Sequence, residues 1–291
     1  MANSFLKPIC FFFTLSLSTI HTVAVANSVY GLLENDGMMT PQYDTAKKAT
    51  VAIIRKENLD EKNLYLMKDL YRYCTPQPFS EQKIWAGCSG TLVAKDVVLT
   101  AGHCVRNAAD CENLSIAVDF DSSNSIDEIR LNTSKLHGCK KILYSSKPVP
   151  KTQLRDWALI QLKTSVADRE PIQLLGPHSP GTTAIFALGH PMGMPKKISA
   201  GFIHQEDYNY NIKNPASPFY KSRFLTPAGL SGGGVYSADF KFFGIVVRGG
   251  TAYEKDDKCT VPVECTTDSC PWAEIQKVDY KKIKTILLNK K

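Results

Sequence analysis

The chain has 291 residues with 35 basic and 28 acidic side chains, which gives a net charge of +7 at pH 7. A charge of this size over this length serves solubility. The densest basic run, Lys281–Lys284 with Lys290–Lys291, lies in an amphipathic C-terminal segment and is interpreted as a solvated helix face. Composition and charge therefore favour neither a nucleic-acid partner nor a membrane surface.

Residues 1–26 have the composition of a secretory signal peptide. Lys7 supplies a positive charge, Ile9–Leu17 form a short apolar core, and Ala24–Ala26 provide a cleavage site of small residues. An uncleaved anchor is the less favoured alternative, because the apolar run is short and interrupted by Ser and Thr. We therefore expect a secreted or periplasmic protein that has no membrane contact after cleavage.

The number of cysteines is typical of an exported protein. Cys10 would leave with the signal peptide, and an even number in an exported chain predicts up to four disulfides. A zinc site formed by Cys88, His103, Cys104 and Cys111 is the less favoured alternative, so we expect no metal and no other cofactor. The eight remaining cysteines are Cys74, Cys88, Cys104, Cys111, Cys139, Cys259, Cys265 and Cys270.

The first half of the mature chain contains short apolar or alternating runs separated by turn residues, which predict the strands of a barrel or sandwich. Before them, residues 27–48 are polar and without clear periodicity, and whether they form a propeptide stays open. Leu59–Tyr73 has leucines at helical spacing and is predicted to be a helical insertion. The predicted strands of this half, residues 49–165, are Thr50–Ile54, Gly90–Val93, Val97–Leu99, Leu114–Phe120, Ile129–Asn132, Ile142–Tyr144 and Ala158–Leu162.

A second β-rich half, residues 166–291, follows a polar connection over Lys163–Pro171. Its C-terminal segment is predicted to be an amphipathic helix, with an apolar stripe opposite several lysines. The predicted strands are Thr183–Leu188, Lys197–His204, Val235–Tyr236 and Phe242–Arg248, and the stripe consists of Ile275, Val278, Ile283, Ile286 and Leu287. The chain is therefore predicted to be an all-β protein with two β-rich domains.

Three short segments carry the chemistry: L-T-A-G-H-C at Leu99–Cys104, D-W-A-L-I-Q-L at Asp156–Leu162 and G-L-S-G-G-G at Gly229–Gly234. A histidine supplies a base near neutral pH, a buried carboxylate orients it, and a serine hydroxyl between glycines attacks a carbonyl. His103, Asp156 and Ser231 are therefore the candidate catalytic residues.

Each of these residues also has a structural interpretation. His103 could be a buried histidine beside a disulfide, Asp156 an ordinary loop acid, and Ser231 part of a glycine-rich turn. The segment around Ser231 also fits G-x-S-x-G, the nucleophile elbow of α/β-hydrolases, but that family needs a histidine after the serine. All six histidines precede Ser231: His21, His103, His137, His178, His190 and His204.

From about Thr50 to its C-terminus the chain resembles the chymotrypsin-like (trypsin-fold) serine proteases. The segments G-C-S-G-T-L-V and V-V-L-T-A-G-H-C are similar to that family's first cysteine, strand and histidine block. The resemblance implies two antiparallel six-stranded β-barrels with the active site between them. It also implies a disulfide between Cys88 and Cys104, and an oxyanion hole formed by the backbone N–H groups of Gly229 and Ser231.

The chain departs from the animal trypsin pattern at two positions. Leu230 stands where trypsins carry the aspartate that pairs with a new N-terminus, so a trypsinogen-like activation is not expected. Leu225 stands where a second aspartate binds Arg or Lys. Phe186–Gly201 is closer to bacterial peptidases related to glutamyl endopeptidase, yet Val246 or Val247 occupies the place of their glutamate-binding histidine.

The candidate substrate-binding residues follow from this alignment. Leu225 and Thr226 would line a specificity pocket without negative charge, and Val247, Arg248 and Gly249 would form the edge strand that binds the peptide backbone. We expect cleavage after neutral residues, because an unpaired charge is costly to bury.

The sequence thus predicts an exported, monomeric serine endopeptidase that acts on proteins or peptides through an acyl-enzyme. An inactive binding protein on a protease scaffold, or an esterase with the same triad, are the alternatives.

Overall fold

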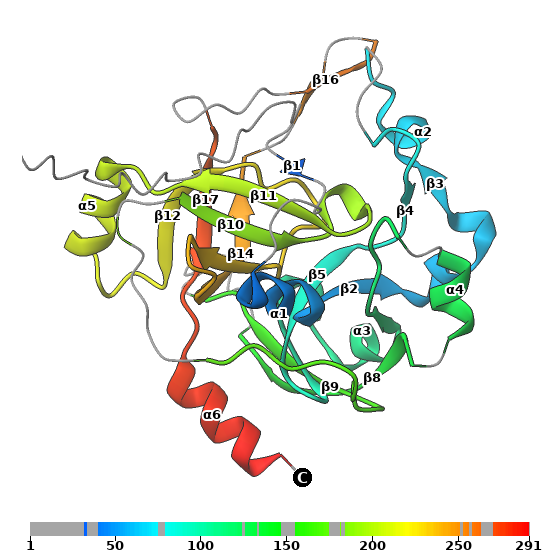
Figure 1. The fold of residues 1–291 in the computed structure, drawn as a ribbon, viewed down its shortest axis with the longest axis horizontal. Helices are drawn as coiled ribbons and strands as arrows, with labels where there is room; N and C mark the ends of the chain where they lie inside the picture. The colour runs from blue at the N-terminus through cyan, green and yellow to red at the C-terminus, as the bar shows by residue number, and fades with distance from the viewer. Residues whose placement is uncertain are drawn as a thin grey trace, which may run out of the picture.

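In the computed structural model two β-barrels lie side by side, with the first at the lower right of Figure 1 and the second at the upper left. The signal peptide predicted for residues 1–26 lies outside the described part of the chain. The structure describes residues 32–33, 40–74, 79–123, 126–132, 134–146, 155–174, 181, 184–250, 253–255, 258–262 and 270–290.

The first barrel is a closed ring of six strands in which all neighbours are antiparallel. Strand β2 of this ring is buried on both faces. One face points into the barrel, and the other packs beneath Trp85 and Phe120 of the surrounding loops. In spatial order the strands are β2 (Thr50–Arg55), β5 (Cys88–Ala94), β6 (Val97–Thr100), β9 (Ala158–Leu162), β8 (Leu136–Ser145) and β7 (Leu114–Ala117).

The second barrel is also a closed antiparallel ring of six strands, to which β1 (Leu32–Leu33) adds on the outside of β11. The ring closes where Gly201 pairs with Phe224. A Cβ on Gly201 would lie 2.2 Å from Cβ of Phe224, so only glycine permits this approach. Its strands in spatial order are β11 (Lys197–Phe202), β10 (Ala184–Gly189), β13 (Gly234–Ser237), β14 (Phe242–Gly249), β17 (Trp272–Gln276) and β12 (Phe219–Phe224). The prediction of two six-stranded antiparallel barrels is confirmed.

Outside the two barrels the described chain forms helices, 3₁₀ turns and two short strand pairs. The C-terminal helix α6 begins after Asp279, whose carboxylate accepts the N–H of Lys282, and it buries Ile283. The remaining elements are α1 (Pro41–Ala49), α2 (Met67–Tyr71), α3 (Ala108–Glu112), α4 (Ile126–Leu131), α5 (Gln205–Lys213), α6 (Tyr280–Asn289), the strand pairs β3 (Tyr65–Leu66) with β4 (Lys83–Ile84) and β15 (Tyr253–Lys255) with β16 (Thr260–Pro262), and the 3₁₀ turns η1 (Lys56–Leu59), η2 (Glu61–Asn63), η3 (Gly102–Cys104) and η4 (Pro191–Gly193).

Three predictions about individual elements are wrong. The strand expected at Ile129–Asn132 belongs largely to helix α4, because Ile129 is buried together with Ile126 one helical turn earlier. The helix expected over Leu59–Tyr73 is broken into 3₁₀ turns, strand β3 and the five-residue helix α2. Ile275, which was assigned to the C-terminal helix, lies in strand β17.

Three disulfides join described residues. Cys88 is bonded to Cys104 and Cys111 to Cys139, both within the first barrel. Cys74 is bonded to Cys259 over a separation of 185 residues, which ties the insertion after η2 to strand β16 of the second half. Cys270 is also disulfide-bonded, and Cys265 lies outside the described residues.

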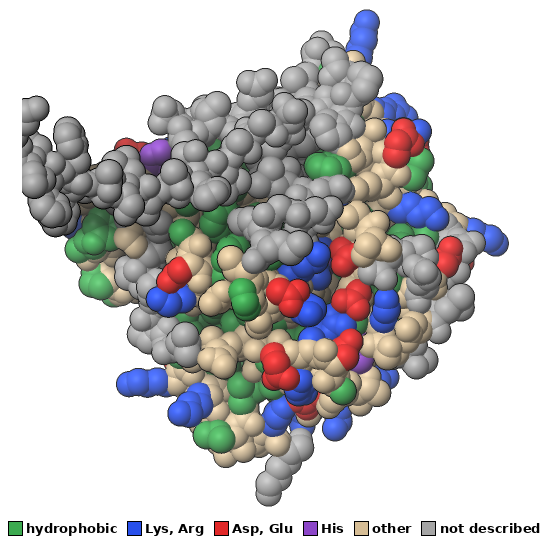
Figure 2. Space-filling view, viewed as in Figure 1, with side chains coloured by type: hydrophobic (Ala, Val, Ile, Leu, Met, Phe, Trp, Pro, Cys, Tyr) green, Lys and Arg blue, Asp and Glu red, His purple; other side chains and the backbone are tan. Residues whose placement is uncertain are grey.

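The surface mixes both signs of charge. Figure 2 shows acidic and basic side chains interspersed over the face that carries helix α1 and the first barrel. Between residues 32 and 290, the helices that the structure describes are all too short or too polar to cross a membrane.

Candidate active site

His103 and Asp156 meet because they follow and precede two paired strands. Strand β6 ends at Thr100 and pairs there with Ala158, the first residue of β9. The Nδ1 atom of His103 lies 2.7 Å from Oδ2 of Asp156, and the backbone N–H of His103 donates to Oδ1 at 2.9 Å. Both oxygens of this largely buried carboxylate, 7% exposed, therefore hold one histidine in place.

Two neighbours shape this pair. A Cβ on Gly102 would lie 2.9 Å from Oδ1 of Asp156, so a glycine is required for the close approach. The backbone N–H of Asp156 donates to Oε1 of Gln276 at 2.6 Å. Because Gln276 ends strand β17, the second barrel holds the backbone of an acidic residue that precedes a strand of the first barrel.

Ser231 lies in the loop between β12 and β13, at the junction of the two barrels. Its carbonyl oxygen accepts the N–H of Ser89 at 2.8 Å and lies 3.8 Å from Sγ of Cys104, the residue after His103. The hydroxyl of half-buried Ser231 and Nε2 of exposed His103 have no hydrogen-bond partner among the described residues. Both are therefore available to a ligand that enters the junction.

The backbone around Ser231 offers two unused donors. The N–H groups of Leu230, Gly232 and Gly233 donate to backbone carbonyls at 2.8–3.2 Å. Within the described residues, those of Gly229 and Ser231 have no acceptor. Gly229 has φ of 89°, a conformation that L-residues rarely adopt. These two N–H groups are the ones predicted to bind a negatively charged oxygen.

A pocket of about 330 Å³ opens beside Ser231. The predicted residues Thr226, Val247, Arg248 and Gly249 line it. Pro227, Ala228 and Trp272 also line it and were missed; Trp272 begins strand β17, for which the local sequence gave no alternating signal. The complete lining is Thr226, Pro227, Ala228, Ser231, Val246, Val247, Arg248, Gly249 and Trp272.

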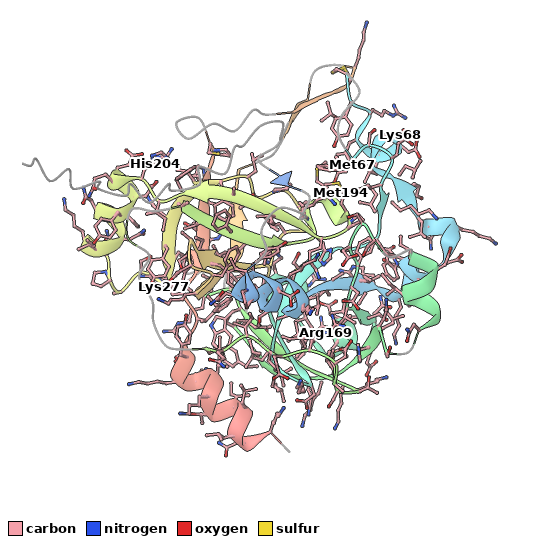
Figure 3. All side chains as sticks on the ribbon, viewed as in Figure 1. Met67, Lys68, Arg169, Met194, His204 and Lys277 are labelled. Carbon is pink, nitrogen blue, oxygen red and sulfur yellow. A yellow bond between two sulfur atoms is a disulfide. The ribbon has the colours of Figure 1, made fainter. Side chains whose placement is uncertain are left out.

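Leu225 does not line this pocket. Its side chain is fully buried in an apolar cluster with Met67, Met192 and Met194. Met67 and Met194, both labelled in Figure 3, belong to this cluster. Leu225 is therefore a core residue, and the sequence alignment alone did not distinguish this role from lining the pocket.

The charge of Arg248 is already balanced. Its Nε atom lies 3.1 Å from a carboxylate oxygen of Glu274, its cross-strand partner, and its guanidinium group stacks 4.5 Å from the ring centre of Phe219. Sequence reasoning missed Glu274, because the pair depends on the register between β14 and β17.

Leu230 is fully buried in the core of the second barrel, packed with Phe224, Val235 and Phe243. A side chain in this environment cannot form an ion pair with a chain terminus.

The two buried histidines lie apart from the pocket. His190 stacks on Phe120 with ring centres 5.4 Å apart, and its Nδ1 lies 3.1 Å from the carbonyl of Met194. Burial lowers its pKa to about 3. Burial also lowers the pKa of His137, which contacts Thr164. Neither residue has a position from which it could act on a group beside Ser231.

A zinc site at the histidine block is not formed. Cys88, His103 and Cys104 do approach within 4.8 Å of one another. The two cysteines are joined in a disulfide, and Cys111 is bonded to Cys139, so none of them offers a thiolate.

Comparison with known proteins assigns the family. The trypsin-like peptidase domain family matches residues 88–245, more than half of the chain, and the protein belongs to that family. A trypsin-like protease from Streptomyces glaucescens is 31% identical over 88 residues, which cover 30% of this chain and 30% of that protein.

Solved structures share the fold at low sequence identity. A Glu endopeptidase superimposes with a TM-score of 0.51 and 13% identity, covering 89% of this chain and 96% of the other. An inactivated protease paralogue of the scabies mite superimposes with a TM-score of 0.52 and 16% identity, covering 84% and 97%. The second comparison shows that this fold also occurs in a protein described as inactivated, so activity has to be argued from the site.

Proposed function

We propose that the protein is an exported serine endopeptidase, with residues 49–165 and 166–291 as its two catalytic domains. The observation that carries the proposal is the pair of hydrogen bonds from His103 to Asp156, beside a serine whose hydroxyl and N–H are both free. His103 and Asp156 belong to the first barrel and Ser231 to the second, and the carbonyl oxygen of Ser231 lies 3.8 Å from Sγ of Cys104, the residue after His103.

The geometry supports the following reaction. Oγ of Ser231 attacks the peptide carbonyl carbon while its proton passes to Nε2 of His103, and Asp156 stabilises the imidazolium that forms. The N–H groups of Gly229 and Ser231 bind the oxygen that becomes negative. His103 then gives the proton to the leaving amine, which breaks the peptide bond and leaves an ester on Ser231. Water, deprotonated by His103, hydrolyses this ester and restores the enzyme.

Labelling with a fluorophosphonate tests this proposal. The reagent phosphorylates a serine only when a neighbouring base activates it, so we expect one labelled residue, Ser231, located by peptide mass spectrometry. Ser231→Ala should lose the label, and Ser123→Ala, at an exposed serine of a surface loop, should keep it. A folded wild type without label would support the inactive binding protein instead. A labelled enzyme that hydrolyses esters and leaves peptides intact would support the esterase.

The pocket favours substrates with a neutral residue before the cleaved bond. Val246, Val247 and Trp272 are apolar, and Arg248 is already paired with Glu274. A bulge between Val246 and Arg248 leaves Val247 without a partner in the pairing of β14 with β17. At this residue strand β14 can bind the substrate backbone. A peptide-library digest should show cleavage after small or apolar residues. Cleavage after Lys or Arg would contradict the assignment. Cleavage after Glu or Asp that disappears in Arg248→Ala would assign the pocket to Arg248.

The disulfides support export, because such bonds persist in oxidising compartments. We propose that residues 1–26 are removed and that the mature protein works as a monomer without a cofactor. N-terminal sequencing of the exported protein should begin at Asn27, and a start at Met1 would contradict the signal-peptide assignment.

A further inference from the structure

Ser89 lies at the point where the first barrel contacts the loop of the candidate nucleophile. It is the second residue of β5, directly after the disulfide-bonded Cys88, and is fully buried. Its hydroxyl donates to the carbonyl of Gly229 at 2.8 Å and accepts the N–H of His190 at 2.8 Å. Its own N–H donates to the carbonyl of Ser231 at 2.8 Å. One residue of the first barrel thus holds two carbonyls of the loop that carries Ser231.

The second barrel is shaped to receive this side chain. A Cβ on Gly189 would lie 2.5 Å from Oγ of Ser89, and a Cβ on Gly232 would lie 2.3 Å from the Ser89 carbonyl. That carbonyl also accepts the hydroxyl of Thr100 at 2.7 Å. Ser89 is therefore held from both sides, and two glycines are needed to admit it.

These contacts hold Gly229 from its C-terminal side. A peptide group is planar, so a fixed carbonyl also fixes the N–H of the following residue. With the carbonyls of Gly229 and Ser231 held by Ser89, the N–H groups of Leu230 and Gly232 point to their own acceptors within the protein. The N–H of Gly229 belongs to the preceding peptide group, whose Ala228 carbonyl accepts the N–H of Met192 at 2.5 Å. Gly229 is thus fixed on both sides, by Met192 before it and by Ser89 after it, while its own N–H has no acceptor among the described residues.

We propose that Ser89 is a positioning residue, whose hydroxyl holds Gly229 in the conformation that binds the transition-state oxygen. This inference rests on the proposed peptidase function and concerns the same site. Ser89 does not touch the substrate. It acts through Gly229, so its effect should appear in the chemical step and not in substrate binding.

The test compares Ser89→Ala with Ser222→Ala, which removes a fully buried hydroxyl that donates to the carbonyl of Ala273. We would measure kcat and KM for a cleaved peptide, and the affinities for a peptidyl boronate and for the N-terminal product peptide. The boronate forms a tetrahedral adduct on serine with a hydroxyl at the oxyanion position, whereas the product lacks the tetrahedral centre.

Loss of a whole oxyanion donor lowers kcat by about 100- to 1000-fold, so a misdirected donor should cost about 10- to 100-fold. We expect Ser89→Ala to lose this factor in kcat and in boronate affinity, with KM and product affinity within about twofold of wild type. Ser222→Ala should match wild type in all four, and Ser89→Thr, which keeps the hydroxyl, should recover much of kcat. If Ser89→Ala does not fold, Ser89→Gly provides the same comparison.

An unchanged kcat in folded Ser89→Ala would overturn the inference, as would equal losses in boronate and product affinity. A wild type that neither cleaves peptides nor reacts with the fluorophosphonate would instead refute the proposed function.

Discussion

Two histidines of this chain show how position decides the chemistry of the same side chain. His103 is exposed and its Nδ1 lies 2.7 Å from the carboxylate of Asp156. His190 is fully buried against Phe120, near the positive charge of Lys196, and both conditions favour the neutral ring. The fold therefore holds the ring of His190 in its neutral form.

The buried histidine predicts an acid-sensitive stability. The pKa of His190 is about 3 in the folded protein and near 6.5 when unfolded, so the unfolded chain binds the additional proton between these values. Its contribution to stability is complete above about pH 6.5 and falls by about 1.4 kcal/mol for each pH unit toward pH 3.

Urea unfolding at pH 7, 6, 5 and 4 checks this prediction in wild type and His190→Asn, whose amide can still donate to Met194. The variant should be less stable at pH 7, because it loses the stacking on Phe120. Between pH 6 and pH 4, the free energy of unfolding of the variant should fall by about 2 to 3 kcal/mol less than that of wild type. Parallel curves for the two proteins would contradict the neutral, buried state of His190.

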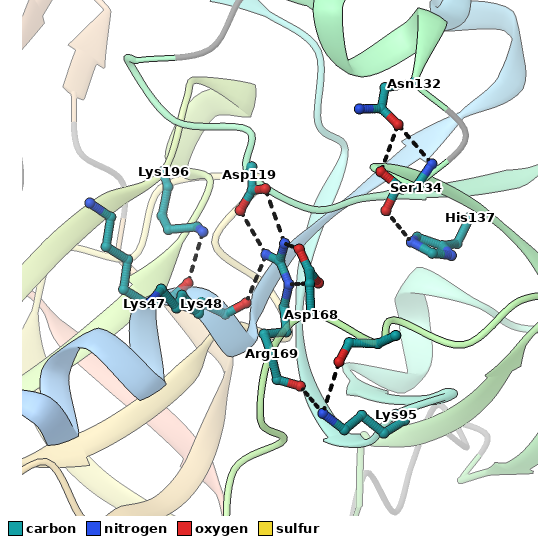
Figure 4. Close-up of polar contacts among 11 residues, drawn as sticks. Lys47, Lys48, Lys95, Asp119, Asn132, Ser134, His137, Asp168, Arg169 and Lys196 are labelled. Atoms are coloured by element: carbon teal, nitrogen blue, oxygen red, sulfur yellow. Dashed lines mark hydrogen bonds and ion pairs between the residues drawn. The ribbon is translucent and has the colours of Figure 1, made fainter.

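At the scale of elements, helix α1 is fixed at its C-terminus by cations from distant segments (Figure 4). The ammonium of Lys196 donates to the carbonyl of Lys47 at 2.8 Å, and Arg169 donates to that of Lys48 at 3.3 Å. Arg169, with its side chain 4% exposed, also binds Asp119 through two hydrogen bonds and Asp168 through two more. Positive charge at a helix C-terminus is stabilising, so α1 is joined to both barrels.

Replacing Arg169 should therefore destabilise the protein strongly. Arg169→Met leaves the half-buried Asp119 without its partner, and removal of one member of a buried pair costs about 3 to 5 kcal/mol. Lys68→Met, which breaks the exposed pair with Glu81, should leave stability nearly unchanged. Urea unfolding at pH 7 measures both, and similar losses in the two variants would contradict the structural role assigned to Arg169.

Some strands could be predicted from the sequence, and others could not. Strands β2, β6, β9 and β14 were found because runs of apolar residues mark them locally. Strand β17 was missed: its residues W-A-E-I-Q show only two buried apolar side chains, and pairing with β12 and β14 makes the segment a strand. Residues of this strand complete the pocket and support Asp156, so the specificity determinants were less predictable than the candidate triad.

The candidate triad itself was predictable because each member lies in a short segment with its own chemical character. What these segments could not reveal is how the barrels hold them. The role of Ser89 depends on the contact of β5 with the loop of Ser231, and that of Gln276 on the contact of β17 with Asp156. Such contacts join residues more than 100 positions apart, and no local pattern marks them.

In the whole molecule, the candidate active site lies where the two barrels pack against each other, and it depends on that packing. One continuous apolar core includes residues of both barrels and of helix α6. The disulfide between Cys74 and Cys259 adds a covalent link between the halves. His103 and Asp156 come from one barrel and Ser231 from the other, so the distance between the candidate base and the candidate nucleophile depends on how the barrels pack together.

The most direct test of the central claim is the turnover of a peptide substrate by Ser231→Ala, His103→Ala, Asp156→Ala and the variant with all three changes. If the residues act as a unit, each of the first two should lose nearly as much kcat as the triple variant, and Asp156→Ala somewhat less. Peptide turnover near the wild-type rate in folded Ser231→Ala, or losses that simply multiply from one variant to the next, would contradict the assignment of these residues as a catalytic triad.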